Sequence, residues 1–352
     1  MRPPNFWYQE TGSSWPMLLA PLGKLYEFCA RTRWAMVSPR HLSIPVICVG
    51  NLVAGGAGKT PTAIAIAKIL QRRGVDVHFI LRGYGDGLGI DIRWKRGSSI
   101  ADDGDKWTSV RVNSERHFAR QVGDEALLLA QTAPTWSGKD RVASANSAIK
   151  SGAQCLILDD GFQNPGLHKD LSLVVIDGAV GLGNGKVMPA GPLRENPARG
   201  LGRAQGVLIM GDDLANVENN FKKLCERPLP ILRAKLRPAG NEADIGGKRV
   251  YAFAGIGRPE KFFATLKEMG CELVETAIFD DHHFYTTNEI PTILIKAGKM
   301  NAVPVTTEKD YLRIGKKARA DIHYLPVAVA WRDQSAIEEW LQPVLEQIQL
   351  GD

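Results

Sequence analysis

A glycine-rich loop between an apolar run and a helical pattern constrains this chain more than any other segment. The apolar run covers residues 44–49, and the loop ends in Gly58-Lys59-Thr60. A helical pattern follows at once, from Pro61 to about Arg73. Glycines let backbone N–H groups converge on a phosphate, and the positive end of the helix dipole adds to that attraction. The order of strand, loop and helix therefore predicts a phosphate-binding P-loop, with Val53 standing where the strict spacing has its first glycine.

The residues of this loop are expected to have separate roles. Lys59 would reach the β- and γ-phosphates of a nucleotide, and the Thr60 hydroxyl would hold Mg²⁺. Gly55 and Gly56 must supply the flexibility that the missing first glycine would give. A tight turn before an ordinary helix is the alternative, but the Lys-Thr pair at the helix start favours a nucleotide. The predicted nucleotide-binding residues are Gly55, Gly56, Ala57, Gly58, Lys59, Thr60 and Pro61.

A second apolar run, residues 155–158, ends in two adjacent carboxylates, Asp159 and Asp160. In P-loop NTPases the Mg²⁺-holding acid sits at the end of a strand beside the loop. Two neighbouring carboxylates repel each other unless a cation or a donor compensates them, and in a strand they point to opposite sides. The pair therefore predicts a metal site in which the two acids differ in role, and which of them ligates directly stays open. An acidic turn that merely closes the strand is the alternative.

Strand-like and helical patterns alternate along most of the chain, which predicts an α/β fold. The expected architecture is a P-loop NTPase-like, mostly parallel sheet flanked by helices, followed by a smaller C-terminal α/β domain. With 352 residues, 44% of them hydrophobic, the chain can hold two such units. The proline-rich stretch at residues 228–238 breaks the pattern and is expected to be the linker. The predicted domains are an N-terminal amphipathic helix (1–40), a core (41–235) and a C-terminal unit (236–352).

The net charge of +6 suits an anionic partner, such as a nucleotide, a phospholipid surface or a phosphorylated substrate. No nucleic-acid recognition motif is present, so a nucleic-acid partner is not expected. No apolar stretch approaches the roughly 20 residues that span a bilayer. Residues 15–37 nevertheless combine a helical apolar stripe with tryptophans and basic side chains. This pattern is typical of an interfacial membrane anchor, but the residues alone favour an amphipathic helix packed on its own domain.

Three further polar clusters fall in segments expected to be loops or helix starts. Asp124 opens a helix, where a carboxylate can cap the helix or act in a site. His282 and His283 follow two aspartates, but adjacent side chains rarely converge on one metal ion, so a catalytic or orienting histidine is favoured over a metal site. The Pro- and Gly-rich loop at residues 186–195 carries Arg194, and long ordered loops tend to be functional, which favours substrate binding.

Several of these segments, taken in order, resemble the tetraacyldisaccharide 4'-kinases of lipid A biosynthesis. The resemblance extends from about residue 7 to the segment at 306–310, and the number of motifs makes it highly specific. The matching motifs are Gly50-Asn51-Leu52 through Gly58-Lys59-Thr60-Pro61, Leu81-Arg82-Gly83-Tyr84-Gly85, Val122-Gly123-Asp124-Glu125, Leu158-Asp159-Asp160-Gly161-Phe162-Gln163, Pro189-Ala190-Gly191-Pro192-Leu193-Arg194-Glu195 and Asp281-His282-His283.

The resemblance implies transfer of the γ-phosphoryl group of ATP to the 4'-hydroxyl of a lipid-linked disaccharide 1-phosphate, with Mg²⁺. It also implies a peripheral or monotopic enzyme on the cytoplasmic face of a Gram-negative inner membrane. An anionic membrane surface then becomes an expected partner, and residues 1–40 become the expected anchor. The chain is expected to act as a monomer.

The family also implies roles for individual residues, carried over by motif match. An Asp–His pair, Asp124 with either His282 or His283, would activate the acceptor hydroxyl, and Lys59 would serve the phosphates. Closure of the C-terminal unit over the core would bring this pair together. The expected metal site comprises Thr60, Asp159, Asp160 and Gln163, and the expected substrate contacts are Arg82, Arg194 and Glu195.

One motif departs from the family, because Asn164-Pro165 follows Gln163 where Gln-His is expected. Two rival functions remain. The loop resembles that of dimeric P-loop ATPases of the metal-insertion and partitioning type, although those carry a second lysine where this chain has Ala54. The other rival function is that of a non-catalytic nucleotide-binding scaffold. A scaffold of this kind would leave the acidic and histidine clusters without a role.

Overall fold

The computed structural model describes residues 4–8, 14–83, 109–225, 227–240 and 242–351. Within these ranges the larger sheet has nine strands, in the order β13-β8-β7-β6-β1-β5-β2-β4-β3. From β8 to β4 neighbouring strands are parallel, whereas β13 and β3 at the two edges are antiparallel. The strands are β1 (Val46–Gly50), β2 (Val77–Arg82), β3 (Val110–Arg111), β4 (Thr135–Gly138), β5 (Cys155–Asp159), β6 (Leu171–Asp177), β7 (Gly206–Met210), β8 (Ile231–Pro238) and β13 (Val327–Trp331).

The central strands are buried on both faces, which is why they read as continuous apolar runs in the sequence. Side chains alternate between two hydrophobic clusters, one on each face of the sheet. One face is covered by α3 (Lys59–Arg72), α5 (Asp124–Leu129) and α13 (Gln334–Gly351), and the other by α6 (Arg141–Lys150), α7 (Pro197–Arg203) and α8 (Val217–Leu224). The predicted mostly parallel α/β architecture is confirmed.

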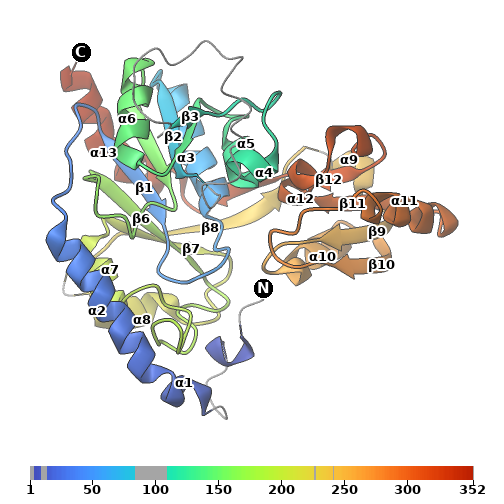
Figure 1. Cartoon of the computed structure of the whole chain (residues 1–352), viewed down its shortest axis with the longest axis horizontal. Helices are drawn as coiled ribbons and strands as arrows, with labels where there is room; N and C mark the ends of the chain where they lie inside the picture. Colours follow the sequence, from blue (N-terminus) through green and yellow to red (C-terminus); the bar gives the residue numbers. More distant parts are fainter. Residues whose placement is uncertain (1–3, 9–13, 84–108, 226, 241, 352) are drawn as a thin grey trace.

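A second, four-stranded parallel sheet lies beside the core in a smaller unit (Figure 1). Its described strands occur in the order β10-β9-β11-β12, and α12 faces α5 of the core. These elements are β9 (Arg249–Ala254), α10 (Pro259–Glu268), β10 (Glu272–Ile278), α11 (Glu289–Lys299), β11 (Val303–Thr307), α12 (Glu308–Arg313) and β12 (His323–Leu325), with the short α9 (Glu242–Ile245) before them and the 3-10 turn η3 (Lys316–Ala318) after α12.

The boundaries expected for the C-terminal unit need correction. Most of the stretch expected to be a linker, 228–238, forms β8. Pro228 and Pro230 precede the strand, Pro238 is its last residue, and Leu232 and Ala234 are buried within it. The chain then leaves for the small sheet and returns: β13 pairs with β8, and α13 buries Ile337 and Leu341 in the core. The small unit is therefore an insertion between β8 and β13, and the segment 236–352 is not one unit.

The N-terminal segment is helical and largely exposed. After the 3-10 turn η1 (Asn5–Trp7), α1 (Trp15–Leu18) and α2 (Ala20–Met36) run along the core near α7 and α8 (Figure 1). Gly23 is the one buried residue in these two helices, so most of their apolar side chains face outward. None of the described helices combines the length and apolar character needed to cross a membrane. The remaining short helix is α4 (Ala119–Val122), which precedes α5.

Candidate active site

The glycine-rich loop connects β1 to α3 at the carboxyl edge of the parallel strands. Gly55 and Gly58 have φ values of 116° and 89°, in the left-handed region that favours glycine. Gly58 stands directly before the first residue of α3, so the backbone bends sharply and the helix N-terminus faces the loop. Lys59 folds back over this loop, with its Nζ 3.4 Å from the carbonyl oxygen of Gly55. The arrangement can receive a phosphate among the loop amides and the lysine.

Thr60 and Asp159 form a buried pair beneath the loop. The Thr60 hydroxyl donates to Asp159 Oδ2 at 2.8 Å, and both residues are 2% exposed. Asp159 Oδ1 has no hydrogen-bond partner among the described residues. Burial, with the charge of nearby Glu125, raises the pKa of Asp159 to about 7. A buried carboxylate oxygen without a partner, beside a hydroxyl, fits a hard cation such as Mg²⁺.

Asp160 differs from Asp159 because cations already surround it. Its carboxylate accepts a hydrogen bond from Arg194 Nη1 at 2.7 Å and lies 3.8 Å from Lys59 Nζ. Burial alone would raise the pKa of Asp160, but Lys59 and Arg194 outweigh it and lower the pKa. Its φ of 54° is uncommon for a residue other than glycine and turns the chain away from the end of β5. The two adjacent aspartates therefore occupy different environments.

Gln163, Arg194 and Glu195 form a network on the Asp160 side of the loop. Gln163 Nε2 donates to the carbonyl of Asn51 at 2.8 Å and to Glu195 Oε1 at 3.2 Å. Arg203 binds both oxygens of Glu195, at 2.8 and 2.7 Å. The side chain of Gln163 thus orders the P-loop backbone rather than reaching the pair Thr60–Asp159. The loop at 186–195 is fixed to the nucleotide loop by these contacts.

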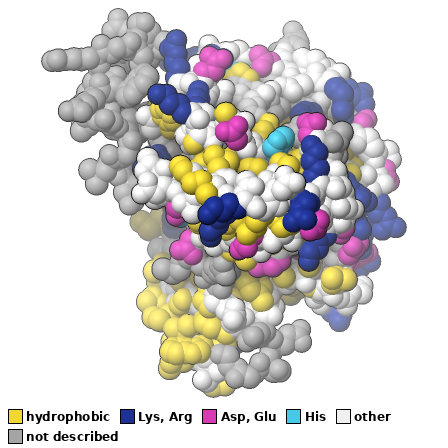
Figure 2. All heavy atoms as spheres, turned by 90° about the vertical axis from the view of Figure 1, so that its right-hand side faces the viewer, with side chains coloured by type: hydrophobic (Ala, Val, Ile, Leu, Met, Phe, Trp, Pro, Cys, Tyr) yellow, Lys and Arg dark blue, Asp and Glu magenta, His cyan; other side chains and the backbone are white. Residues whose placement is uncertain are grey.

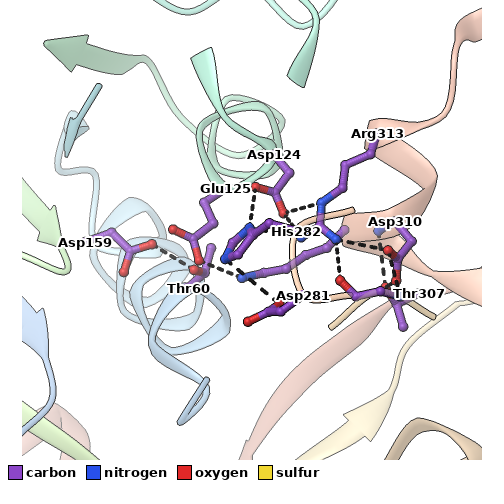
Figure 3. Close-up of polar contacts among 11 residues, drawn as sticks. Thr60, Asp124, Glu125, Asp159, Asp281, His282, Thr307, Asp310 and Arg313 are labelled. Carbon is purple, nitrogen blue, oxygen red and sulfur yellow. Dashed lines mark hydrogen bonds and ion pairs between the residues drawn. The ribbon is translucent and has the colours of Figure 1, made fainter. Parts of the chain in front are cut away.

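Asp124 begins α5 and lies 5% exposed at the junction of the core and the small unit. The guanidinium of Arg313, from α12, donates to its Oδ2 through Nε at 3.1 Å and also through Nη2. Nη1 of the same guanidinium donates to the Gly255 carbonyl at 2.6 Å and to Asp310 at 3.0 Å. Burial opposes ionisation of Asp124, but contacts with His282 and Arg313 outweigh it and lower its pKa. Asp124 is therefore a carboxylate held ionised in a buried position (Figure 3).

The two adjacent histidines separate into different environments. His282 Nδ1 lies 3.7 Å from Asp124 Oδ1 and 3.3 Å from Arg313 Nη2, and its side chain is 43% exposed. Asp124 raises the pKa of His282 above the ordinary value, against burial, which lowers it. His283 instead contacts Glu289 at 3.0 Å and stacks on Phe279 within the small unit. Only His282 of the two is brought to Asp124 in the described structure.

The backbone at His282 has a φ of 59°, which a residue other than glycine adopts rarely. A hydrogen bond from its N–H to the Gly255 carbonyl, at 3.1 Å, holds this conformation. Strain of this kind, about 1–3 kcal/mol, is concentrated at functional sites. Figure 3 shows His282 pointing from the small unit toward Asp124, with Thr60 and Asp159 beyond Glu125.

Glu125 links this junction to the P-loop side. Lys309, from α12, donates to Glu125 Oε1 at 2.7 Å. The charge of Lys309 lowers the pKa of Glu125, although burial opposes the shift. Within the described residues, no three or more His, Cys, Asp or Glu side chains converge into a ready-made metal cluster. A cation would therefore rest on Thr60, Asp159 and oxygens supplied by a ligand.

The structure gathers most of the predicted site residues, but in two groups about the P-loop. Thr60, Asp124, Asp159 and His282 lie on the side of the small unit, and Asp160, Gln163, Arg194 and Glu195 lie on the other. Arg82 ends β2 and is exposed at the same carboxyl edge. Tyr84 and Gly85 of the motif that follows it lie outside the described residues.

Sequence reasoning missed two cations of α12, Lys309 and Arg313. Their spacing of four residues, after Thr307 as a helix N-cap, was the available signal. Short amphipathic helices are common, so the spacing alone does not identify the acids that these cations bind.

Comparison with known proteins agrees with the geometry. Residues 15–346 match the family model for tetraacyldisaccharide-1-P 4'-kinase. The tetraacyldisaccharide 4'-kinase of Rhodospirillum centenum is 45% identical in sequence, in an alignment that covers 98% of this chain and 97% of the relative. That of Parvibaculum lavamentivorans is 43% identical, and the alignment covers 96% of this chain and 92% of the relative. The structure of an LpxK from Aquifex aeolicus, solved in complex with ATP, has the same fold, with a TM-score of 0.69 and 23% sequence identity. The superposition covers 94% of this chain and 99% of that protein. The chain thus belongs to the tetraacyldisaccharide-1-P 4'-kinase family.

Proposed function

We propose that this chain transfers the γ-phosphoryl group of ATP to the 4'-hydroxyl of a tetraacyldisaccharide 1-phosphate, in lipid A biosynthesis. The names of the family and of the relatives describe a kinase that acts on the 4' position of a tetraacyldisaccharide. The observation that supports it best here is the pairing of buried, ionised Asp124 with His282, across from the P-loop residues Lys59 and Thr60. The metal-insertion and partitioning ATPases have no support in these comparisons.

The P-loop side serves the nucleotide. The loop amides and Lys59 would bind the β- and γ-phosphates and neutralise charge that builds up during transfer. Thr60 and Asp159 would hold Mg²⁺, which fits the carboxylate oxygen of Asp159 that lacks a partner. Bound there, Mg²⁺ would neutralise phosphate charge. Asp160 would keep Lys59 and Arg194 oriented toward the phosphates.

His282 is the proposed general base. With a proton on Nδ1 directed at Asp124, Nε2 presents the lone pair that accepts the proton of the acceptor hydroxyl. The negative charge of Asp124, 3.7 Å from Nδ1, would favour this tautomer and stabilise the imidazolium that forms, and Arg313 keeps Asp124 ionised and in place. His283, bound to Glu289, would position the turn that carries His282.

The opposite group of residues is the proposed contact for the substrate headgroup. Arg82 and Arg194 lie near the carboxyl edge of the sheet, and cationic side chains bind phosphates readily. Glu195 is paired with Arg203 and Gln163, so its proposed role is to keep the loop at 186–195 in place beside the substrate.

The N-terminal helices are the proposed membrane contact, on the cytoplasmic face of the inner membrane. Trp15, Leu18, Leu22, Leu25 and Phe28 are each more than half exposed. Figure 2 shows hydrophobic side chains gathered at the lower end of the molecule, where α1 lies in Figure 1. A helix that leaves its apolar side chains outward can bury them in the headgroup region. The acceptor's acyl chains could then stay in the bilayer while its sugar reaches the site.

The test is transfer of labelled γ-phosphate from ATP to a tetraacyldisaccharide 1-phosphate in detergent micelles with Mg²⁺. Labelled lipid should form with the native chain and be lost with Lys59→Ala. Lys150→Ala is the matched control, because Lys150 is exposed at the end of α6. ATP hydrolysis without labelled lipid would instead support an ATPase, and nucleotide binding without turnover would support a scaffold.

A further inference from the structure

The helix α12 presents two cations, four residues apart, to the first turn of α5. Arg313 is 1% exposed at its side chain and contacts His282 in addition to its four hydrogen bonds to Asp124, Gly255 and Asp310. Lys309 is 27% exposed at its side chain and, among the described residues, donates one hydrogen bond, to Glu125. The guanidinium is therefore fixed from several directions, whereas a single carboxylate holds the ammonium.

The ammonium of Lys309 contacts Glu125 at 2.7 Å, and the charges of Asp124 and Asp159 also act on it. Burial alone would lower the pKa of Lys309, but Glu125, Asp124 and Asp159 together outweigh it and raise the pKa. The negative charge of Glu125 also acts on Asp159. Asp159 in turn leaves one oxygen without a partner while it is 2% exposed. Glu125 thus stands between two positions for positive charge, the ammonium of Lys309 and the vicinity of Thr60 and Asp159.

We propose that Lys309 is a stand-in cation: its ammonium neutralises Glu125 until a divalent ion binds at Thr60 and Asp159, and that ion then displaces it. The proposal rests on the Mg²⁺ site of the proposed function. An ammonium and a divalent ion that both interact with Glu125 repel each other, and a divalent ion competes more strongly than an ammonium for a carboxylate.

Displacement of Lys309 would loosen one of the two ion pairs that join α12 to α5 in the described structure. Arg313 would keep the small unit attached, because its two hydrogen bonds to Asp124 of the core do not involve Glu125. Cation loading would in this way be sensed by the element next to His282. The small unit would respond to the metal without leaving the core.

The competing explanation is that Lys309 only tethers the small unit to the core. Lys261 provides the comparison, because it contacts Asp177 of the core at 2.5 Å, from α10 of the small unit. Asp177 also binds Arg258, at 2.5 Å, and neither cation contacts Glu125 or Asp159 in the described structure. Loss of Lys261 therefore removes a tether between the same two units without altering the acids at the cation site.

The experiment measures Mn²⁺ binding to the full chain without nucleotide, by electron paramagnetic resonance. Lys309→Gln should bind Mn²⁺ at least tenfold more tightly than the native chain, whereas Lys261→Gln should stay within about twofold. Lys309→Met, which keeps the length of the side chain, is the second variant should the first fail to fold. Unchanged or weaker Mn²⁺ binding in a folded Lys309 variant would overturn the proposal.

A measurement on the native chain keeps the proposal testable without any substitution. Saturating Mn²⁺ should raise amide hydrogen exchange in α12 relative to α10, and equal or lower exchange in α12 would contradict displacement. The outcome is separable from the kinase assignment. Tighter Mn²⁺ binding by Lys309→Gln in a chain that transfers no phosphate would refute the kinase alone, and transfer with unchanged Mn²⁺ binding would refute the stand-in role alone.

Discussion

Replacement of Asp124 by asparagine should move the pH dependence of phosphoryl transfer in a direction fixed by the site. Asp124 raises the pKa of His282, and a general base must be unprotonated to act. Activity of the native chain should therefore fall as the pH drops through a value above the ordinary pKa of histidine. Asp124→Asn removes the largest cause of the raised pKa, so its acid limb should lie at lower pH.

The size of the shift follows from the separation of the two side chains. At 3.7 Å, a unit charge pair is worth about 4–5 kcal/mol at an effective dielectric constant of 20 and about 1 kcal/mol in water. His282 is 43% exposed, so solvent screening places the interaction toward the lower figure, about 1–2 kcal/mol. Since 1.36 kcal/mol corresponds to one pKa unit, the acid limb should move down by about one pH unit. The plateau rate should also drop about 10²- to 10⁴-fold, because the imidazole loses its orienting partner.

The assay is kcat for labelled phosphate transfer at saturating substrates, measured across the pH range in which the enzyme stays folded. Glu289→Gln is the matched control, because it removes the carboxylate next to His283 and leaves Asp124 untouched. Its acid limb should not move. An acid limb for Asp124→Asn that stayed in place, or moved to higher pH, would refute the assignment of His282 as the base.

Three further predictions concern stability and the membrane. Arg313→Gln should lower the free energy of unfolding by about 3–5 kcal/mol in urea denaturation, because it leaves the buried carboxylate of Asp124 without a cation. Lys222→Gln, which removes an ion pair on the surface, should lower it by less than about 1 kcal/mol. Equal losses in the two variants would contradict the role of Arg313. The pKa of Asp159 in the folded chain, about 7, lies above its ordinary value, so the native chain should lose stability as the pH rises from about 4 to about 7. In thermal melts across this range, Asp159→Asn should make the melting temperature less dependent on pH. An unchanged dependence would contradict the raised pKa of Asp159. Deleting residues 1–40 should reduce the fraction of protein that floats with anionic liposomes. Leu214→Ser, which changes an exposed leucine outside that segment, should leave that fraction unchanged. Full flotation of the shortened chain would refute the anchor hypothesis.

The larger sheet was predictable because its central strands are buried on both faces. Such strands appear as apolar runs, and the runs at residues 44–49 and 155–158 were placed correctly. β4 was not, since its residues Thr135–Gly138 combine buried polar side chains with a glycine. β8 was mistaken for a linker because three prolines lie within residues 228–238 and only two of the strand's side chains, Leu232 and Ala234, are buried.

The site was predictable only where residues lie close together in the sequence or follow a known motif. The P-loop and the aspartate pair met both conditions. The distinction between His282 and His283 could not be made, because it depends on the unusual backbone at His282 and on a carboxylate that lies far away in the chain. The roles of Lys309 and Arg313 could not be predicted for the same reason, because their acidic partners lie on α5, 184 and 189 residues earlier in the chain.

The return of the chain to the large sheet has a consequence for biosynthesis. β8 emerges from the ribosome with one edge exposed, and its partner β13 follows only after the small unit has been made. α13, which buries Trp340 and Val344 against the core, arrives later still. The nucleotide loop is thus synthesised early but sits in a sheet that is completed late. Until then the nascent core exposes an unpaired strand edge and an uncovered apolar face, the features that recruit chaperones.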